Sequence, residues 1–175
     1  MIFEHSEIEI EIEIEKVKNA LKSIPCFTPS GKRDYAILSV LLTTGAGCGE
    51  IARMRYGDLV RTVSSATITT RQKHGKKGIY TLGKGTAQAL IDYLAAIYDK
   101  EYPEDTPLWL SFAHYRTGLA IGKQSISDIC KKWLDTTQVE STNRIYEAIK
   151  KEYGVKGIEN IEKLLGINVE EEVSN

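Results

Sequence analysis

The sequence contains no long apolar segment. Its uninterrupted apolar stretches, such as Ala36-Ile37-Leu38 and Val40-Leu41-Leu42, fall far short of the roughly 18 residues that a membrane span requires. The N-terminus is acidic, whereas a secretory signal peptide begins with basic residues. We therefore expect a cytoplasmic protein with no membrane partner.

Cysteine and histidine are scarce, which leaves little material for a metal site. The cysteines are Cys26, Cys48 and Cys130, whose odd number and wide spacing match neither a disulfide framework nor a paired-cysteine zinc motif. The histidines are His5, His74 and His114, and no two of them share a helical face. The sequence therefore predicts no metal, no cofactor and no small-molecule ligand.

Positive net charge is also missing, yet the charges are unevenly distributed. The whole chain carries −1, but segments 1–15 and 159–175 hold 11 of its 24 acidic residues and a single basic one. The region between them, 16–158, therefore carries a net charge of +9. A basic body with acidic ends is compatible with DNA binding, and equally with an ordinary solvated surface.

The residues that are present describe one globular domain, since the chain has 175 residues, of which 42% are hydrophobic and 27% charged. Helical periodicity and helix-forming composition predict helices over 17–23, 32–44, 50–56, 86–98, 125–133, 143–153 and 158–165. β-Branched residues predict strands over 66–70 and 79–82, joined by a basic hairpin in which Gly75 suits the turn. Ser30 is the expected N-cap of the helix over 32–44. The predicted fold class is mainly α with a small antiparallel β-sheet, an α+β domain.

Residues 7–15 alternate between glutamate and isoleucine with a strict period of two. That period places Ile8, Ile10, Ile12 and Ile14 on one face of an extended strand, whereas on a helix they scatter around the axis. Glutamate itself favours helix over strand, which argues against this interpretation. We expect a terminal strand or arm over 1–15 that docks on its own domain, over 16–175, or on another copy of the chain.

Several segments resemble the tyrosine recombinase, or phage integrase, family. Residues 43–59 read T-T-G-A-G-C-G-E-I-A-R-M-R-Y-G-D-L, which is similar to the family's T-G-L-R-x-S-E-L-x-x-L-R-W-x-D-I. Upstream, G-K-R-D-Y-A-I-L-S-V-L-L resembles a family helix, and downstream K-H-G-K-K-G-I-Y-T-L resembles the family's K-T-G hairpin. The segments P-L-W, S-I-S-D-I-C-K-K-W-L and G-V-K-G-I-E-N-I-E-K-L-L-G-I follow in the family's order, so the resemblance covers nearly the whole chain.

The resemblance implies a catalytic-domain fold that embraces duplex DNA, and a chemistry in which a tyrosine attacks a phosphodiester. In that chemistry two arginines stabilise the charge of the transition state, a hairpin lysine protonates the leaving oxygen, and histidines assist proton transfer. The resemblance also implies a role in DNA recombination or integration, as in phages and mobile elements.

Carried over position by position, the resemblance retains few of these groups. The lysine position is Lys73, and the second arginine is Arg144, with Ser141 where a histidine is expected. The first arginine position falls on Gly47, which has no side chain. A rival box at His114-Tyr115-Arg116 has one residue instead of two between its histidine and arginine.

The last family motif, L-L-G-H, ends here on Ile167 instead of a histidine. The nucleophile would follow just past Asn175, so we expect the chain to end before it. Together with the missing arginine and histidine, this predicts a degenerate site that is inactive by itself unless another molecule supplies the tyrosine.

We therefore predict a degenerate recombinase domain that binds double-stranded DNA. The catalytic remnants are Lys73 and Arg144. The predicted DNA contacts are Arg71, Lys73, His74, Lys76, Lys77 and Arg144, for which the alternative on the hairpin is a solvated turn. The alternative function is a regulatory or assembly partner, which contacts another copy of itself or a full-length recombinase. Structural roles are the alternative for Arg53, Arg55 and Arg61, and we expect Trp109 and Trp133 in the core.

Overall fold

The structure is a computed structural model that describes residues 7–63, 65–97, 101–115, 117–134, 141–154 and 158–167. In chain order these ranges contain α1 (Glu7–Ser23), α2 (Pro29–Thr44), α3 (Cys48–Ala52), the 3₁₀ turn η1 (Tyr56–Asp58), β1 (Leu59–Arg61), β2 (Ala66–Arg71), β3 (Lys77–Leu82), α4 (Lys84–Ile97), α5 (Lys123–Leu134), α6 (Ser141–Tyr153) and α7 (Ile158–Leu165). This mainly helical fold with a three-stranded antiparallel sheet confirms the predicted fold class.

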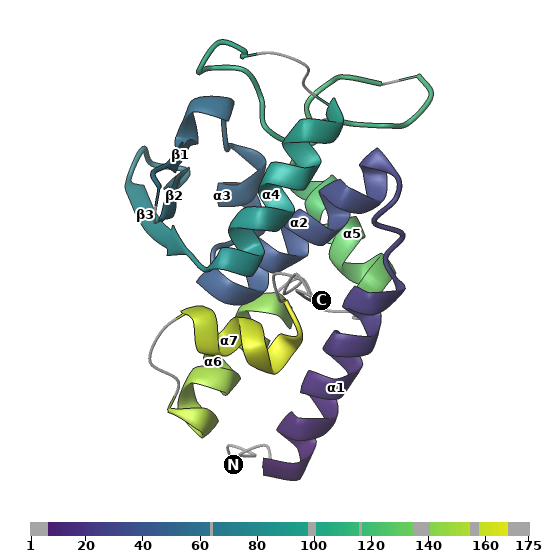
Figure 1. Cartoon of the computed structure of the whole chain (residues 1–175), viewed down its shortest axis with the longest axis vertical. Coiled ribbons are helices and arrows are strands. Elements are labelled where there is room, and N and C mark those ends of the chain that lie inside the picture. The colour runs from purple at the N-terminus through teal and green to yellow at the C-terminus, as the bar shows by residue number, and fades with distance from the viewer. Residues whose placement is uncertain are drawn as a thin grey trace, which may run out of the picture.

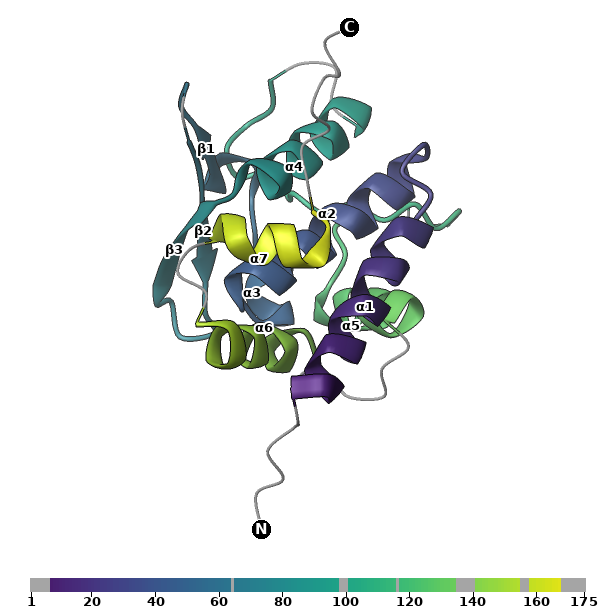
Figure 2. The same ribbon diagram turned by 60° about the horizontal axis from the view of Figure 1, so that its bottom comes forward.

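Helix α2 forms the centre of the domain. Pro29 occupies its first turn, where a missing N–H and a fixed φ are favourable, and Thr28 Oγ1 accepts a 3.0 Å hydrogen bond from the Gly31 N–H. The N-cap is therefore Thr28, and the prediction of Ser30 was wrong because the helix begins at the proline. Helices α3, α4, α5, α6 and α7 all pack against α2. Both views show the sheet on one side of this helical core and α1 on the other (Figures 1 and 2).

The N-terminal segment is helical, so the predicted strand over 1–15 was wrong wherever the structure describes it. Helix α1 runs from Glu7 to Ser23, through the predicted boundary at residue 15. Its buried side chains are Ile10, Ile14, Val17 and Leu21. They follow the spacing of one helical face, and that face continues beyond the alternating stretch. The helix propensity of glutamate and the burial of this apolar face both favour a helix, and together they exceed the preference for a strand that the period of two indicates.

Two isoleucines of α1 stay outside the core. Ile8 is 68% exposed and Ile12 is 50% exposed, one helical turn apart. They lie on the side of the helix opposite Ile10 and Ile14, as the helical period requires.

The sheet has the order β1-β2-β3. Strands β2 and β3 pair from Ala66↔Leu82 at one end to Arg71↔Lys77 at the hairpin tip. Gly75 adopts φ +80°, which glycine tolerates best, and this confirms its place in the turn. Strand β1 was not predicted, because its three residues are too few to show a period of two.

Two tryptophans lie where they were expected. Trp109 is buried and stacks on Tyr93, with ring centroids 5.3 Å apart. Trp133 is packed against the core, and its Nε1 donates a 2.9 Å hydrogen bond to the buried carboxylate of Asp34. No helix in the described ranges has both the length and the apolarity to cross a bilayer.

Helix α7 is fixed to the start of α4 by a buried carboxylate. Glu162 Oε2 accepts hydrogen bonds from the Thr86 N–H at 2.6 Å and from the Thr86 hydroxyl at 2.7 Å. A Cβ at Gly83 would lie 1.8 Å from Glu162 Oε1, so glycine is required there for the carboxylate to enter. Burial raises the pKa of Glu162, and the hydrogen bonds from Thr86 partly oppose that rise.

Candidate functional site

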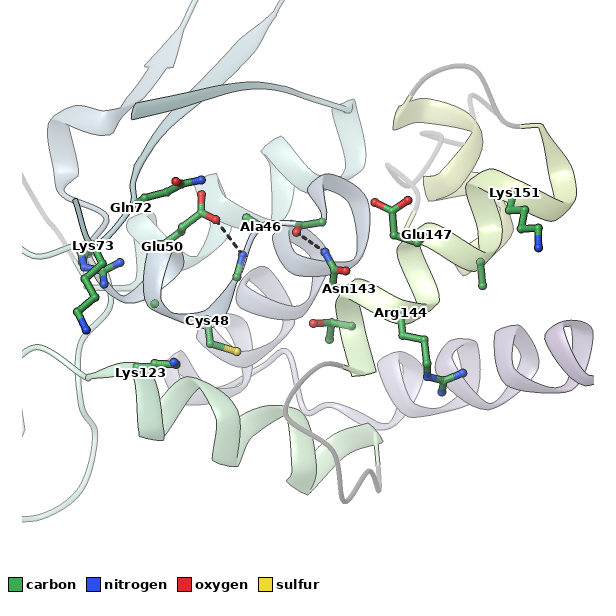
Figure 3. Close-up of a pocket in the computed structure, with 16 residues that line it drawn as sticks. Ala46, Cys48, Glu50, Gln72, Lys73, Lys123, Asn143, Arg144, Glu147 and Lys151 are labelled. Carbon is green, nitrogen blue, oxygen red and sulfur yellow. Dashed lines mark hydrogen bonds between the residues drawn. The ribbon is translucent and has the colours of Figure 1, made fainter. Parts of the chain in front are cut away.

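A cavity of about 960 Å³ opens where the loop between α2 and α3 meets the hairpin, α5 and α6. It is lined by Gly45, Ala46, Gly47, Cys48, Gly49, Glu50, Arg53, Gln72, Lys73, Lys123, Thr142, Asn143, Arg144, Glu147, Ala148 and Lys151. Five of these side chains are basic and two are acidic, so the cavity carries a positive net charge. Figure 3 shows Lys73 and Lys123 at one end and Arg144 and Lys151 at the other.

Gly47 lies at the base of this cavity as the N-cap of α3. Its backbone is extended, with φ −80° and ψ 158°. A Cβ built there meets only Glu50 Oε1 among the described residues, at 3.8 Å. The position to which the family resemblance assigns the first arginine therefore faces open space in a cavity that Lys73 and Arg144 line at opposite ends.

Glu50 holds the base of the cavity to the sheet. Its Oε1 accepts a 3.4 Å hydrogen bond from the Gly47 N–H, and its Oε2 accepts a 2.8 Å hydrogen bond from the buried Thr70 hydroxyl. Thr70 precedes the hairpin tip on β2, so the carboxylate fixes α3 relative to the strand that carries the hairpin.

The C-terminal end of α2 and the first turn of α6 form the wall of the cavity on the Arg144 side. Gly45 ends α2 with φ +71°, and its N–H donates to the Leu41 carbonyl at 3.1 Å. The Gly45 carbonyl accepts a 2.8 Å hydrogen bond from Asn143 Nδ2. A Cβ at Gly45 would lie 2.5 Å from the Tyr146 ring, so α6 packs directly on this turn.

Two residues of the hairpin tip, Gln72 and Lys73, line the cavity, and Lys73 is the basic one. The tip is closed by a 2.8 Å hydrogen bond from the Gln72 N–H to the Lys76 carbonyl. Lys73, His74, Lys76 and Lys77 are all exposed, and the three lysines form no salt bridge within the described ranges. His74, Lys76 and Lys77 lie on the tip beside the cavity and do not line it.

Arg71 differs from the hairpin lysines because it is already paired. Its Nη1 lies 2.6 Å from Oδ2 of Asp58, whose carboxylate is almost fully buried. Arg53 Nη1 donates to the Arg71 carbonyl at 3.1 Å, and Arg55 Nη1 donates to the Asp105 carbonyl at 3.1 Å. These arginines therefore hold the sheet and its neighbouring loops together.

Arg144 lines the cavity from the first turn of α6. Its guanidinium pairs with Glu13 of α1, and Figure 3 shows the side chain extending toward the α1 ribbon. Ser141 is the first residue of α6. Ile167 is 1% exposed in the core and does not line the cavity. In the rival box, His114 is exposed and also lies outside the cavity lining, and Arg116 is outside the described residues.

Sequence reasoning missed Cys48, Lys123 and Lys151 as lining residues. The Cys48 thiol is hydrogen-bonded to Cys130 of α5, which lowers its pKa to about 7, and the charge of Lys123 acts in the same direction. The same hydrogen bond and burial raise the pKa of Cys130. Spacing along the chain gave no signal, because the two cysteines meet only through the packing of α3 on α5.

The chain has partial sequence similarity to proteins named as recombinases. No family model matches the chain. A Sinorhizobium fredii protein named as an integrase/recombinase, y4gC, is 40% identical over 70 residues, which are 38% of this chain and 34% of that protein. The tyrosine recombinase XerD of Listeria innocua is 32% identical over 83 residues, or 47% of this chain and 27% of XerD. The chain spans about a third of the length of these curated relatives.

Two solved structures of the XerH site-specific recombinase have a similar fold. The complex with a palindromic difH substrate after cleavage gives a TM-score of 0.62 at 14% identity, and covers 89% of this chain and 44% of XerH. The pre-cleavage complex gives a TM-score of 0.63 at 13% identity, and covers 95% of this chain and 47% of XerH. The comparisons confirm the predicted resemblance and fold.

Proposed function

We propose that this chain, a domain with the tyrosine recombinase catalytic-domain fold, binds duplex DNA through the cavity and the adjoining hairpin and does not cleave DNA by itself. The observation that carries the proposal is that the cavity gathers Gly47, Lys73 and Arg144, the positions to which the resemblance assigns the catalytic cations. Two of these positions keep a basic side chain and one has lost it.

Electrostatics support the DNA-binding part of the proposal. Lys73, Lys76 and Lys77 are exposed and unpaired within the described ranges, next to a cavity with three further basic residues besides Arg144. Such cations bind DNA by releasing counterions from its phosphates, so the affinity should fall steeply with salt. The relatives are named as recombinases, and the XerH structures are complexes with its difH substrate.

The chain lacks several side chains to which the family resemblance assigns a role in catalysis, and this supports the proposal that it does not cleave DNA by itself. The first arginine position holds Gly47, and the histidine positions hold Ser141 and the buried Ile167. Removing a single electrostatic donor of this kind costs about 100- to 1000-fold in rate. A phosphodiester in this cavity would therefore be held by Lys73 and Arg144 without the full set of groups that stabilises its transition state.

The test is a titration of a labelled duplex of random sequence at increasing salt. We expect the double variant Lys73→Ala/Lys76→Ala to bind more weakly and to reduce the slope of log affinity against log salt by up to about 2. The matched control is Lys22→Ala/Lys163→Ala, which removes two exposed lysines from α1 and α7. An equal loss in both variants would contradict a specific DNA-binding surface.

A second candidate function is assembly with another recombinase chain, or with a second copy of this one, through α1. Exposed Ile8 and Ile12 favour it, because two isoleucines one turn apart form an apolar stripe that association can cover. Sedimentation of the chain and of Ile8→Lys/Ile12→Lys distinguishes the two functions. If the unaltered chain and the variant both sediment as monomers, alone and mixed with a recombinase relative, the assembly function is contradicted and DNA binding is left.

A further inference from the structure

Arg144 is occupied by a carboxylate of its own chain. Its Nη2 lies 2.5 Å from Glu13 Oε1, and its Nη1 lies 3.2 Å from Glu13 Oε2. Both terminal nitrogens therefore face one carboxylate, side by side. Arginine binds phosphate in the same two-pronged manner, because a phosphate also presents paired oxygens to the guanidinium fork. Glu13 thus uses the donors that a DNA phosphate would need.

Packing of α1 holds this carboxylate in place. Glu13 lies next to Ile14 and one turn after Ile10, and both isoleucines are buried in the core. Helix α1 contacts α5, α6 and α7, so its position relative to Arg144 is fixed by apolar contacts and does not depend on the ion pair alone. The carboxylate is therefore presented to Arg144 by the fold.

The pair also lies within reach of solvent. The Arg144 side chain is 38% exposed and the Glu13 side chain 28% exposed. Arg144 contributes to the cavity lining, so an anion that enters the cavity can compete with Glu13 for it. A partly exposed ion pair is weak enough to exchange partners, unlike a fully buried one.

We propose that Glu13 is an internal competitor for DNA phosphate at Arg144, so that α1 lowers the affinity of the domain for DNA. The inference rests on the proposed DNA binding and adds to it a regulatory contact. Glu11 and Glu15, two residues before and after Glu13, are exposed, and the helical period places them on the other side of α1, away from Arg144. Any event that moves α1 away from α6 would release Arg144.

The experiment compares Glu13→Gln with Glu11→Gln in the full chain. Both variants remove one negative charge from α1, but Glu11 forms no salt bridge within the described ranges. We expect Glu13→Gln to raise the affinity for a labelled duplex at low salt by about fivefold, and Glu11→Gln by clearly less. In an Arg144→Ala background, Glu13→Gln should give no more gain than Glu11→Gln. Circular dichroism melting checks that every variant folds.

Two kinds of gain in affinity would overturn the inference. One is an equal gain from Glu13→Gln and Glu11→Gln, which would mean a general charge effect. The other is a gain from Glu13→Gln that persists without Arg144. If the chain binds DNA but Glu13→Gln changes nothing, this inference alone fails. If no variant binds DNA at the lowest salt, the proposed function fails first, and the competition fails with it.

A readout without DNA separates these cases. Phenylglyoxal modifies accessible guanidinium groups, and peptide mass spectrometry follows each arginine separately. We expect Arg144 to react faster in Glu13→Gln than in the unaltered chain, while the exposed Arg61 reacts at the same rate in both. An unchanged Arg144 rate would contradict the shielding by Glu13, whatever the DNA measurements give.

Discussion

Gly47 stands where the family resemblance expects an arginine, and none of the described residues around it requires a glycine there. Its φ of −80° is accessible to every residue, and a Cβ would meet only Glu50 Oε1 among the described residues. Gly45, two residues earlier, is different, because its φ of +71° and the Tyr146 ring both exclude a side chain. The missing arginine is therefore a chemical change that the fold does not impose.

Restoring the side chain tests this view directly. Gly47→Arg places a cation in the cavity beside Lys73 and Arg144. We expect DNA affinity at low salt to rise about tenfold, and the salt slope to steepen by about 1, because one more phosphate is neutralised. Fluorescence anisotropy over a salt series measures both quantities.

The control is Asn19→Arg, which adds the same charge at an exposed site on α1. An equal rise in affinity from Asn19→Arg would show that added charge acts anywhere on the surface, and would contradict a phosphate site at Gly47.

Hairpin cations that look equivalent in sequence have different roles in the structure. Arg71 pairs with the buried Asp58, whereas Lys73 is exposed and lines one end of the cavity. Removing Arg71 would leave the buried Asp58 carboxylate without its cationic partner, although it would keep the hydrogen bond from the Arg55 N–H, so the loss affects folding as well as binding. For this reason the lysines, and not Arg71, are the residues to substitute in a binding test.

Docking of helix α7 on α4 depends on one ionisable group. Glu162→Ala removes the acceptor for the Thr86 N–H and hydroxyl, and we expect it to lower the free energy of unfolding by about 2 kcal/mol. Urea unfolding followed by circular dichroism measures this loss. A loss no larger than that of an ordinary surface substitution would contradict the docking role.

The same carboxylate predicts how stability depends on pH. Burial raises the folded-state pKa of Glu162 above its ordinary value of 4.5. A raised pKa means that the folded chain holds the proton more tightly, so this stabilisation is complete below pH 4.5 and is lost as pH rises through the folded-state pKa. We expect the unfolding free energy of the unaltered chain minus that of Glu162→Gln to decline over this range. A difference that rises with pH would contradict the assignment.

Elements with a strong local signal were predicted well. The sequence predicted α2 from its apolar run, the hairpin from β-branched strands around Gly75, and α7 with the bounds that the structure has. The family resemblance also assigned Gly47, Lys73 and Arg144 to one site. In the structure all three residues line the same cavity. These features follow from periodicity or from a family pattern with fixed order.

Features that depend on contacts between distant segments were not predicted. The period of two in α1 favoured a strand, because only packing against α5, α6 and α7 selects the face of Ile10 and Ile14. The pairs Glu13–Arg144 and Cys48–Cys130 join residues from different helices that no spacing rule connects. These contacts form because tertiary packing brings distant helices together. The pattern of residues along the chain does not contain that information.

The whole molecule has a basic face and an acidic helix that meet at Arg144. Lys73, Lys123 and Lys151 line the cavity, while α1, which carries several exposed glutamates, passes its Arg144 end. The basic cavity attracts DNA phosphates, and the acidic helix at its Arg144 end repels them. The net charge of −1 also gives little long-range electrostatic steering of the chain toward DNA. We expect modest, strongly salt-dependent affinity from this domain alone.

Alkylation of Cys48 in the presence of DNA tests directly whether duplex DNA occupies the cavity. Cys48 lines the cavity but is only 7% exposed, so a small reagent such as iodoacetamide is needed to reach it from the cavity. Its lowered pKa of about 7 favours the thiolate that such a reagent attacks, whereas Cys26 is exposed elsewhere and has a raised pKa. At low salt and saturating duplex, DNA in the cavity should cover the thiol and raise its pKa through the negative phosphates. We expect the alkylation rate of Cys48 to fall severalfold while the rate of Cys26 stays constant. An unchanged Cys48 rate while the duplex is bound would contradict DNA binding in the cavity.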